Sequence, residues 1–399
     1  MPPGVRAFPW YLVGIGSWFA SAGMQNIVFT WLVTVVLHEP PARVGVAQMS
    51  LMAPAIFLML LGGAVADRAD GRRLLVRGHL VSALPPLVLG VAIARGGLTY
   101  GALIAYALAV GTAGAFVMPA RDAMLTRVAA GGLGRAVAVM TAVQFAAQLV
   151  GIAVGGGAGA IGAPALLFLQ AAVLASGGVA ALRLPAAPPV LETAPRSRLG
   201  AMRDGLRAAA ESPILAPVLI ANLAVGVLYV GAFFVILPLI VRDAYGGGSA
   251  ELSLLSLGFW GGTIGSTLVQ IRLGALRRPG RAIVLALLLG AGVLAAMAWP
   301  GPFRALVALC VVWGLGAGVV MTQARTLVQA AAPETHRARI LSLFQLGLMG
   351  GAPVGALLIG YVAGLSGPRA AVVYPAAGML AVLAGLLLRS RLWQQGEAR

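Results

Sequence analysis

The chain has 399 residues, of which 60% are hydrophobic and only 10% are charged, with a net charge of +17. Soluble domains carry about 25% charged residues, so this charge is too sparse to cover the surface of a soluble protein. All 28 basic residues are arginine. A chain without lysine excludes a P-loop nucleotide site and a lysine Schiff base. The single cysteine, Cys310, excludes an internal disulfide and a thiolate metal cluster.

Apolar runs of about 20 residues recur along the whole chain, and each is long enough to cross a bilayer as a helix. The first run is longer than the apolar region of a signal peptide and has no small-residue cleavage site behind it. Continuous apolar runs also exclude a transmembrane β-barrel, whose strands alternate apolar and polar residues. We therefore predict an all-α membrane protein with twelve transmembrane helices over residues 10–37, 44–66, 74–94, 98–120, 136–158, 164–182, 214–241, 252–271, 282–299, 305–325, 340–363 and 370–388.

The arginines are distributed unevenly between the two sides of these spans. With the amino terminus inside, 23 of the 28 arginines lie in segments on the inner side, and the five on the outer side are Arg43, Arg95, Arg242, Arg304 and Arg369. Because arginine-rich loops stay in the cytoplasm, the asymmetry predicts a multi-pass membrane protein with cytoplasmic N- and C-termini. We expect this membrane to be the bacterial inner (plasma) membrane. Topology thus accounts for the basic charge, and we expect no nucleic-acid partner.

The two halves of the chain can be aligned without a gap at an offset of 204 residues. Five arginines coincide in this alignment, including Arg135 with Arg339, and Gly151 coincides with Gly355. Two six-helix halves are typical of the parallel repeats of major facilitator transporters, which hold substrate near the membrane midplane between the repeats. We predict an N-terminal half over 1–182, a cytoplasmic linker over 183–213 and a C-terminal half over 214–399.

The linker contains the pattern of a short amphipathic helix. Apolar residues fall on one helical face and arginines on the opposite face: Leu199, Met202, Leu206 and Ala210 against Arg203 and Arg207. Such a helix would lie in the membrane interface. A solvated linker without this helix is the alternative.

The segment between the second and third spans reads GAVADRADGRR over residues 63–73. It resembles the signature loop G-x-x-x-D-R-x-G-x-R-R of the major facilitator superfamily. Gly63 is expected to let two helices approach closely, and Asp67 to accept hydrogen bonds from arginine or from a helix N-terminus. The alternative is that these charges only fix the topology. The chain departs from the pattern at Asp70, which occupies a glycine position.

With Asp70, the loop is more similar to the branch of enterobactin exporters and macrolide-efflux proteins, also called transmembrane secretion effectors. The segments MPAR at 118–121 and RILS at 339–342 agree with that branch. In the superfamily, the charged cluster locks the cytoplasmic side in the outward-open state. The resemblance therefore implies a set of gating residues: Gly63, Asp67, Arg68, Asp70, Arg72, Arg73, Arg121, Asp122, Arg325 and Arg339.

None of the 11 carboxylates falls in the middle of a predicted span. Ionisable groups within the membrane are the usual proton relays of transporters, so proton coupling would have to use Asp67 or Asp122 at the inner ends of spans. We hypothesise that Asp122 titrates during gating, and a permanently paired structural aspartate is the alternative. The three histidines, His38, His79 and His336, are expected at span ends or in loops, at the membrane interface.

Uncharged polar and aromatic side chains do lie near the middle of spans. In the superfamily, the first, fourth, seventh and tenth spans line the substrate cavity, and the second, fifth, eighth and eleventh flank it. An amide in lipid is costly, so these amides should face either the cavity or a partner helix, and both remain open. The candidate substrate-binding residues are Gln25, Asn26, Gln144, Gln148, Asn222, Tyr229 and Trp313.

The resemblance implies a secondary active transporter that works by alternating access, and favours a proton-coupled exporter of drugs, siderophores or lipid-like molecules. Amides and aromatics without a fixed mid-membrane charge suit a neutral, zwitterionic or amphiphilic solute. The alternatives are a uniporter or importer of a small metabolite, a lysolipid transporter, and a scaffold or sensor that moves nothing. We expect a monomer whose partners are a small-molecule substrate, membrane lipids and protons. We expect no metal, no cofactor and no catalytic residue.

Overall fold

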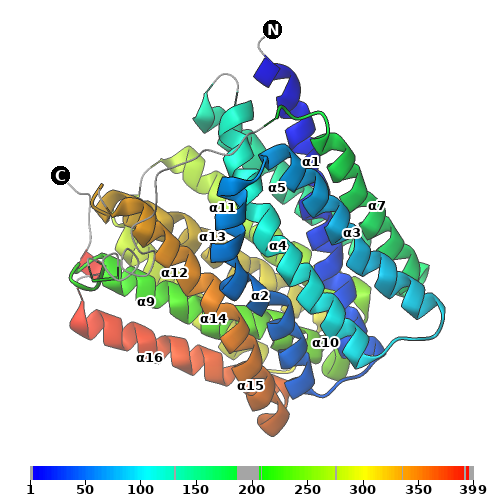
Figure 1. Ribbon diagram of the computed structural model, residues 1–399. Helices are drawn as coiled ribbons and strands as arrows, with labels where there is room; N and C mark the ends of the chain where they lie inside the picture. The colour runs from blue at the N-terminus through cyan, green and yellow to red at the C-terminus, as the bar shows by residue number, and fades with distance from the viewer. Residues whose placement is uncertain are drawn as a thin grey trace. The chain divides into compact units, whose positions relative to one another are not determined.

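The computed structural model describes residues 3–129, 132–186, 206–207, 209–274, 276–334, 336–390 and 392–394. Within these residues every regular element is a helix (Figure 1). Twelve helical segments are long and apolar enough to cross a membrane. The predicted all-α fold with twelve transmembrane helices is confirmed.

Six of the twelve segments come from the first half of the sequence, and each overlaps the span predicted for it. They are α1 (Pro3–Trp31) with its π-helical continuation η1 (Leu32–Val36), α2 (Pro41–Arg68), α3 (Gly71–Ala94), α4 (Tyr100–Val128), α5 (Leu133–Gly155) and α7 (Ala163–Ala181). The single turn α6 (Ala158–Ile161) separates α5 from α7. It ends at Gly162, whose φ of 95° is a backbone conformation that favours glycine.

The second half supplies the other six segments. The seventh span is α9 (Leu215–Ala224), η2 (Val225–Val230), η3 (Ala232–Ile236) and α10 (Leu237–Tyr245), and η2 and η3 are π-helical. Then come α11 (Ser249–Leu273), α12 (Pro279–Met297), α13 (Phe303–Ala331), α14 (Arg337–Ser366), the short α15 (Pro368–Ala371), α16 (Val373–Arg389) and a final 3₁₀ turn, η4 (Leu392–Gln394). The amphipathic linker helix predicted around residues 199–210 lies largely outside the described residues.

The chain forms two compact units. Unit 1 comprises Met1–Glu39, Ser50–Glu192 and Gly246–Leu254, and unit 2 comprises Pro40–Met49, Thr193–Tyr245 and Leu255–Arg399. Each unit therefore consists mostly of one sequence half and takes in one short segment of the other half. The predicted division of the chain into two halves and a linker stays a prediction.

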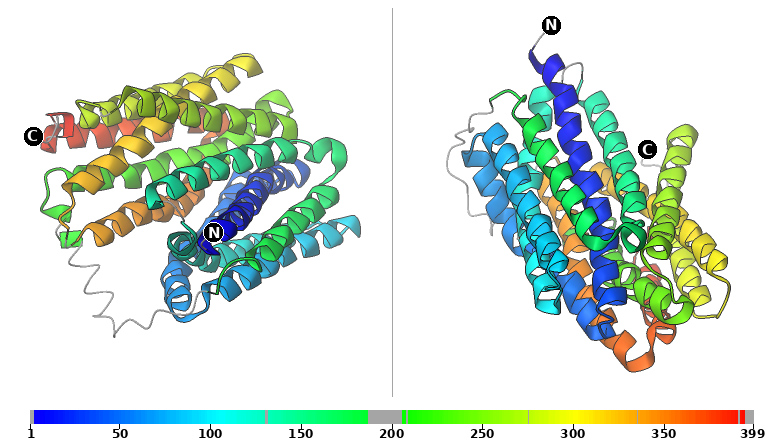
Figure 2. Two further views of the ribbon diagram at one scale, coloured as in Figure 1. Left: turned by 90° about the horizontal axis from the view of Figure 1, so that it is seen from above. Right: turned by 90° about the vertical axis from the view of Figure 1, so that its right-hand side faces the viewer.

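Close helix crossings in unit 1 depend on glycine. Helices α1 and α5 lie side by side (Figure 2). A Cβ atom on Gly151 of α5 would lie 2.0 Å from the carbonyl oxygen of Ala20, and one on Gly23 of α1 would lie 2.4 Å from that of Gln148. No side chain fits at either position, so the two backbones are in direct contact, as in small-residue crossings of membrane helices.

Unit 2 contains the corresponding crossing. A Cβ on Gly355 of α14 would lie 2.1 Å from the carbonyl oxygen of Val227 in η2. Gly355 follows Gly151 by 204 residues. Two glycines aligned by the repeat thus each allow close backbone contact between the first and fifth spans of their half. This equivalence supports the repeat predicted from the sequence.

The segments taken in from the other half are held by specific contacts. In unit 1, the hydroxyl of Ser249 donates to the carbonyl of Gly156 at 2.8 Å, and that of Ser253 donates to the carbonyl of Ile152 at 2.8 Å. Both bonds join the start of α11 to the end of α5. In unit 2, Gly45 of α2 packs so closely on α14 that its Cβ would lie 2.5 Å from the carbonyl oxygen of Ala356.

Candidate functional site

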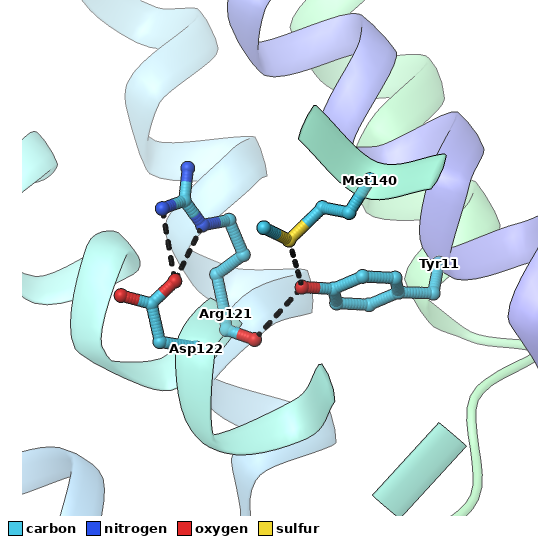
Figure 3. A network of polar contacts seen from close by, with 4 residues as sticks. All are labelled: Tyr11, Arg121, Asp122 and Met140. Carbon is cyan, nitrogen blue, oxygen red and sulfur yellow. Dashed lines mark hydrogen bonds and ion pairs between the residues drawn. The ribbon is translucent and has the colours of Figure 1, made fainter. Parts of the chain in front are cut away.

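A polar network lies at the end of unit 1 where α4 ends and α1 begins (Figure 3). Arg121 of α4 donates from Nε and Nη2 to the Oδ1 atom of Asp122, at 3.0 and 2.9 Å. The hydroxyl of Tyr11 donates to the backbone carbonyl of Arg121 at 3.2 Å and lies 3.3 Å from the sulfur of Met140. The network therefore joins α1, α4 and α5. We call this end of unit 1, which carries Arg68, Arg72, Arg73, Arg121 and Arg127, its arginine-rich end.

Arg121 and Asp122 differ strongly in exposure. The side chain of Arg121 is 13% exposed and that of Asp122 is 64% exposed. The guanidinium also lies over the ring of Phe19, 5.3 Å from its centroid, and its Nη1 atom is buried without a hydrogen-bond partner among the described residues. The arrangement favours the paired role for Asp122, and it leaves one buried donor of Arg121 available to an acceptor.

The signature loop is organised by Asp70. Its carboxylate accepts a hydrogen bond from the backbone N–H of Arg73 at 2.9 Å and so caps the N-terminus of α3. Aspartate is among the best N-cap residues, and its charge also complements the helix dipole. Capping is therefore a physical reason for the aspartate at this glycine position. Asp67 lies in α2, but its side chain falls outside the described part of the chain.

The expectation for Gly63 is wrong. Among the described residues, a Cβ on Gly63 would meet no atom within 4 Å, whereas one on the preceding Gly62 would lie 2.1 Å from the carbonyl oxygen of Ala115 in α4. Successive residues of an α-helix point about 100° apart, so a shift of one residue changes the face. Gly62, together with Gly111 of α4, lets α2 and α4 approach each other.

The remaining candidate gating residues belong to separate units. In unit 1, Arg68 and Arg73 are exposed and Arg72 is half-buried. In unit 2, Arg325 is exposed on α13, and Arg339 is half-buried in the first turn of α14. Their gating roles stay predictions.

The helices that carry the amides of the first and fifth spans pack against each other in unit 1. The carbonyl of Gln148 contacts α1 at Gly23, two and three residues before Gln25 and Asn26. These three amide side chains and that of Gln144 are partly exposed. This placement is compatible with contact to a solute, and their role in substrate binding stays a prediction.

The candidates in unit 2 are buried and make contacts between helices. Asn222 of α9 donates from Nδ2 to the carbonyl of Phe344 in α14 at 2.6 Å, and the Tyr229 hydroxyl donates to the carbonyl of Leu287 in α12 at 2.6 Å. Trp313 is 3% exposed and packs edge-on against Tyr229, with ring centroids 5.7 Å apart. Of the two roles left open for amides, Asn222 fills the interhelical one in this structure.

Contrary to the prediction, His79 does not lie at a helix end or in a loop. It lies in the ninth position of α3, is 4% exposed, and packs edge-on against Trp18 of α1 at 5.6 Å between ring centroids. The sequence did contain a signal for this position. His79 is a titratable residue inside the apolar run 74–94, and the residue aligned with it in the second half is Ile283. The helix face that carries it could not be deduced from so uniformly apolar a segment.

Twelve apolar helices in two related sets, with glycine crossings and a charged network at one end, define a polytopic transporter of the major facilitator type. A family model described as transmembrane secretion effector matches residues 8–398. The chain belongs to this family, which confirms the branch that the signature loop resembles.

Curated relatives align along most of the chain. The multidrug efflux pump Tap of Mycobacterium tuberculosis (strain ATCC 25618 / H37Rv) is 27% identical over 379 residues, which cover 91% of this chain and 88% of the relative. The multidrug efflux pump Tap of Mycolicibacterium fortuitum is 26% identical over 364 residues, which cover 88% of each. This chain is thus similar to efflux transporters over nearly its full length.

Solved structures of similar fold belong to several transporter groups. The nucleoside transporter NupG has a TM-score of 0.72 at 15% identity, over 98% of this chain and 99% of that one. A bacterial homologue of the human lysosomal transporter Spinster has a TM-score of 0.72 at 12% identity, over 98% of this chain and 96% of that one. A POT family transporter in complex with 5-aminolevulinic acid has a TM-score of 0.74 at 12% identity, over 99% of this chain and 97% of that one. At such identities the likeness concerns the fold.

Proposed function

We propose that this protein exports amphiphilic, drug-like small molecules by alternating access and draws its energy from the proton gradient. The observation that carries the proposal is the similarity over 91% of the chain to relatives named as multidrug efflux pumps. Membership of the transmembrane secretion effector family over residues 8–398 supports it. Export of drugs, rather than of a single metabolite, is thereby favoured among the functions compatible with the fold.

The side chains of unit 1 suit such solutes. Partly exposed amides on α1 and α5 offer hydrogen bonds without a fixed charge. Aromatic side chains such as Trp18 lie on the same helices. Binding sites for drug-sized ligands are mostly apolar with a few placed polar groups. A neutral, zwitterionic or amphiphilic solute is the class that this combination favours.

The arginine distribution supports an orientation for this exporter. We infer that the arginine-rich end of unit 1 faces the cytoplasm of a bacterial inner membrane, with both termini on that side. Substrate would then enter from the cytoplasm or the inner leaflet. The network of Arg121 and Asp122 would lie at that entrance.

Everted membrane vesicles from an efflux-deficient bacterium that expresses the chain test the proposal. When respiration acidifies the vesicle interior, we expect ethidium and tetraphenylphosphonium to accumulate above the level in vesicles without the chain. Nigericin, which collapses the pH gradient, should abolish the difference. Accumulation of neither cation would contradict drug export. Accumulation that survives the joint collapse of the pH gradient by nigericin and of the membrane potential by valinomycin with potassium would contradict proton coupling.

A further inference from the structure

His79 is enclosed by three helices of unit 1. Its ring lies against Trp18 of α1, and α7 covers another side at Gly177, where a Cβ would lie 2.5 Å from the ring carbon Cδ2. Glycine at that position is what lets α7 pack directly on the imidazole. The ring is therefore held in one place by its surroundings.

Both ring nitrogens of His79 face backbone carbonyl oxygens. Nδ1 lies 2.9 Å from the carbonyl oxygen of Leu75, one turn earlier in α3, and Nε2 lies 3.3 Å from that of Gly14 in α1. A neutral imidazole has one N–H and can donate to only one of these acceptors. A protonated imidazole donates to both, and hydrogen bonds from a charged donor are the stronger ones. The surroundings thus offer the protonated ring one hydrogen bond more than the neutral ring.

The two bonds connect different parts of the unit. The bond to Leu75 lies within α3, whereas the bond to Gly14 joins α3 to α1. The carbonyl of Gly14 also accepts the hydroxyl of Ser17 at 2.9 Å, so it keeps a partner when the ring is neutral. A neutral ring that keeps its shorter bond to Leu75 loses the link to α1. Protonation of His79 would therefore add one hydrogen bond between α3 and α1.

A cavity leads from His79 to the arginine-rich end. Its empty space is about 320 Å³, counted with its open side, and His79 forms part of the wall together with Trp10, Tyr11, Trp18, Val117 and Arg121. The wall is mostly apolar, and its polar side chains include those of Tyr11, His79 and Arg121. A water held between such groups would bring a proton to the ring.

Few ionisable groups face this cavity. Tyr11 of α1 and Arg121 of α4 line it, and Asp122 is paired with Arg121. α7 contains no titratable residue, and Arg77 of α3 itself is exposed. Arg183, beyond the end of α7, lies 4.9 Å over the ring of Trp10. The fixed charge on the cavity wall is thus that of Arg121, neutralised by its neighbour.

We propose that His79 is the proton-binding site of the transport cycle, loaded through this cavity and linked to α1 by the bond from Nε2 to Gly14. The proposal rests on the proton-driven export proposed above. A proton on the ring fastens α1 to α3, and its release loosens α1, the helix that also carries Gln25 and Asn26. Proton binding and solute binding are thereby connected along one helix.

Titration of the ring itself is the first test. The full chain is labelled with ¹⁵N-histidine and carries His38→Gln and His336→Gln, so that the imidazole signals come from His79 alone. We expect them to change reversibly between about pH 5 and 8, the range in which histidine charge usually changes in proteins. Signals that stay constant across this range would overturn the proposal, and this experiment does not depend on a substitution at His79.

Transport by His79→Gln in proteoliposomes is the second test. We expect ethidium accumulation driven by a pH gradient to fall at least tenfold, while ethidium exchange without a gradient persists. The matched variants His38→Gln and His336→Gln should behave as wild type. Gradient-driven accumulation by His79→Gln at the wild-type level would overturn the role of His79 alone. A wild-type protein that ignores the gradient would instead overturn proton-driven export, and the role of His79 with it.

Discussion

Several polar side chains of unit 1 act on backbone groups rather than on each other. Asp70 accepts from the N–H of Arg73, Tyr11 donates to the carbonyl of Arg121, and His79 faces two carbonyls. Such bonds depend on where helices begin and cross, and not only on residue type. Substitutions there therefore report on helix ends and helix contacts as well as on charge.

The first prediction concerns the cap of α3. Asp70→Ala should lower the free energy of unfolding by about 1 kcal/mol, because the N–H of Arg73 loses its acceptor, whereas Asp70→Asn should lose less because asparagine also caps. Thermal unfolding of the purified protein in detergent measures both. Equal losses in the two variants would argue against capping and for a role of the negative charge.

Asp122 offers a test of the ion pair. Asp122→Asn should change thermal stability little, because Asp122 itself is 64% exposed and asparagine keeps an oxygen that can accept from Arg121. Transport should slow because Arg121 loses its charged partner. The response to the pH gradient should persist if His79 carries the proton. Gradient-driven ethidium uptake compared with exchange measures this. Loss of the gradient response alone would return the titrating role to Asp122.

Two amides in different surroundings should respond differently. Gln148→Ala, at a partly exposed position, should weaken ethidium binding about five- to tenfold with little change in stability, as expected for one lost hydrogen bond to a solute. Asn222→Ala should cost about 1–3 kcal/mol of stability, because the buried carbonyl of Phe344 loses its donor. Equilibrium binding and thermal unfolding, measured for both, separate the two effects. Unaltered affinity in Gln148→Ala would remove that residue from the site.

At the scale of helices, the crossings are set by single glycines in a chain that contains 55 of them. The apolar runs predict all twelve spans, because length and hydropathy suffice to identify a helix that crosses a membrane. They do not reveal which glycine faces a neighbour, since the helices are apolar on every side. The error at Gly63 and the misplacement of His79 have this common physical cause.

The crossing of α2 and α4 allows an adjacent-residue test. Gly62→Ala should push the helices apart and cost about 1–3 kcal/mol, since its Cβ would lie 2.1 Å from the carbonyl oxygen of Ala115. Gly63→Ala, whose Cβ meets no atom of the described part of the chain within 4 Å, should be neutral or slightly stabilising because alanine favours helix. Expression level and thermal unfolding of the two variants give the comparison. Equal damage at both positions would mean that Gly63 packs against α4 as well.

At the scale of the molecule, the repeat and the arginine asymmetry are readable from sequence because they involve many residues at once. The function of individual side chains is not, because it depends on contacts between residues far apart in the chain. Asp70 illustrates the limit: its departure from the signature pattern was visible, but its capping role required the position at which α3 begins.

The orientation of the whole chain is tested by cysteine labelling. In a Cys310→Ala background, Gly301→Cys and Glu334→Cys place one thiol beyond each end of α13. With cytoplasmic termini, we expect an impermeant maleimide to label residue 301 in intact cells of a bacterium without its outer membrane barrier, and residue 334 only after lysis. The reverse pattern would invert the proposed topology.

The segment that joins α11 to α5 has a consequence for biogenesis. The hydroxyls of Ser249 and Ser253 reach unit 1 only after the seventh span has been synthesised and inserted. During synthesis, the end of α5 therefore lacks these two hydrogen bonds until the segment up to residue 254 has been made and inserted. Separately expressed halves would each lack a segment of their own compact unit, so complementation would require both fragments in the same membrane.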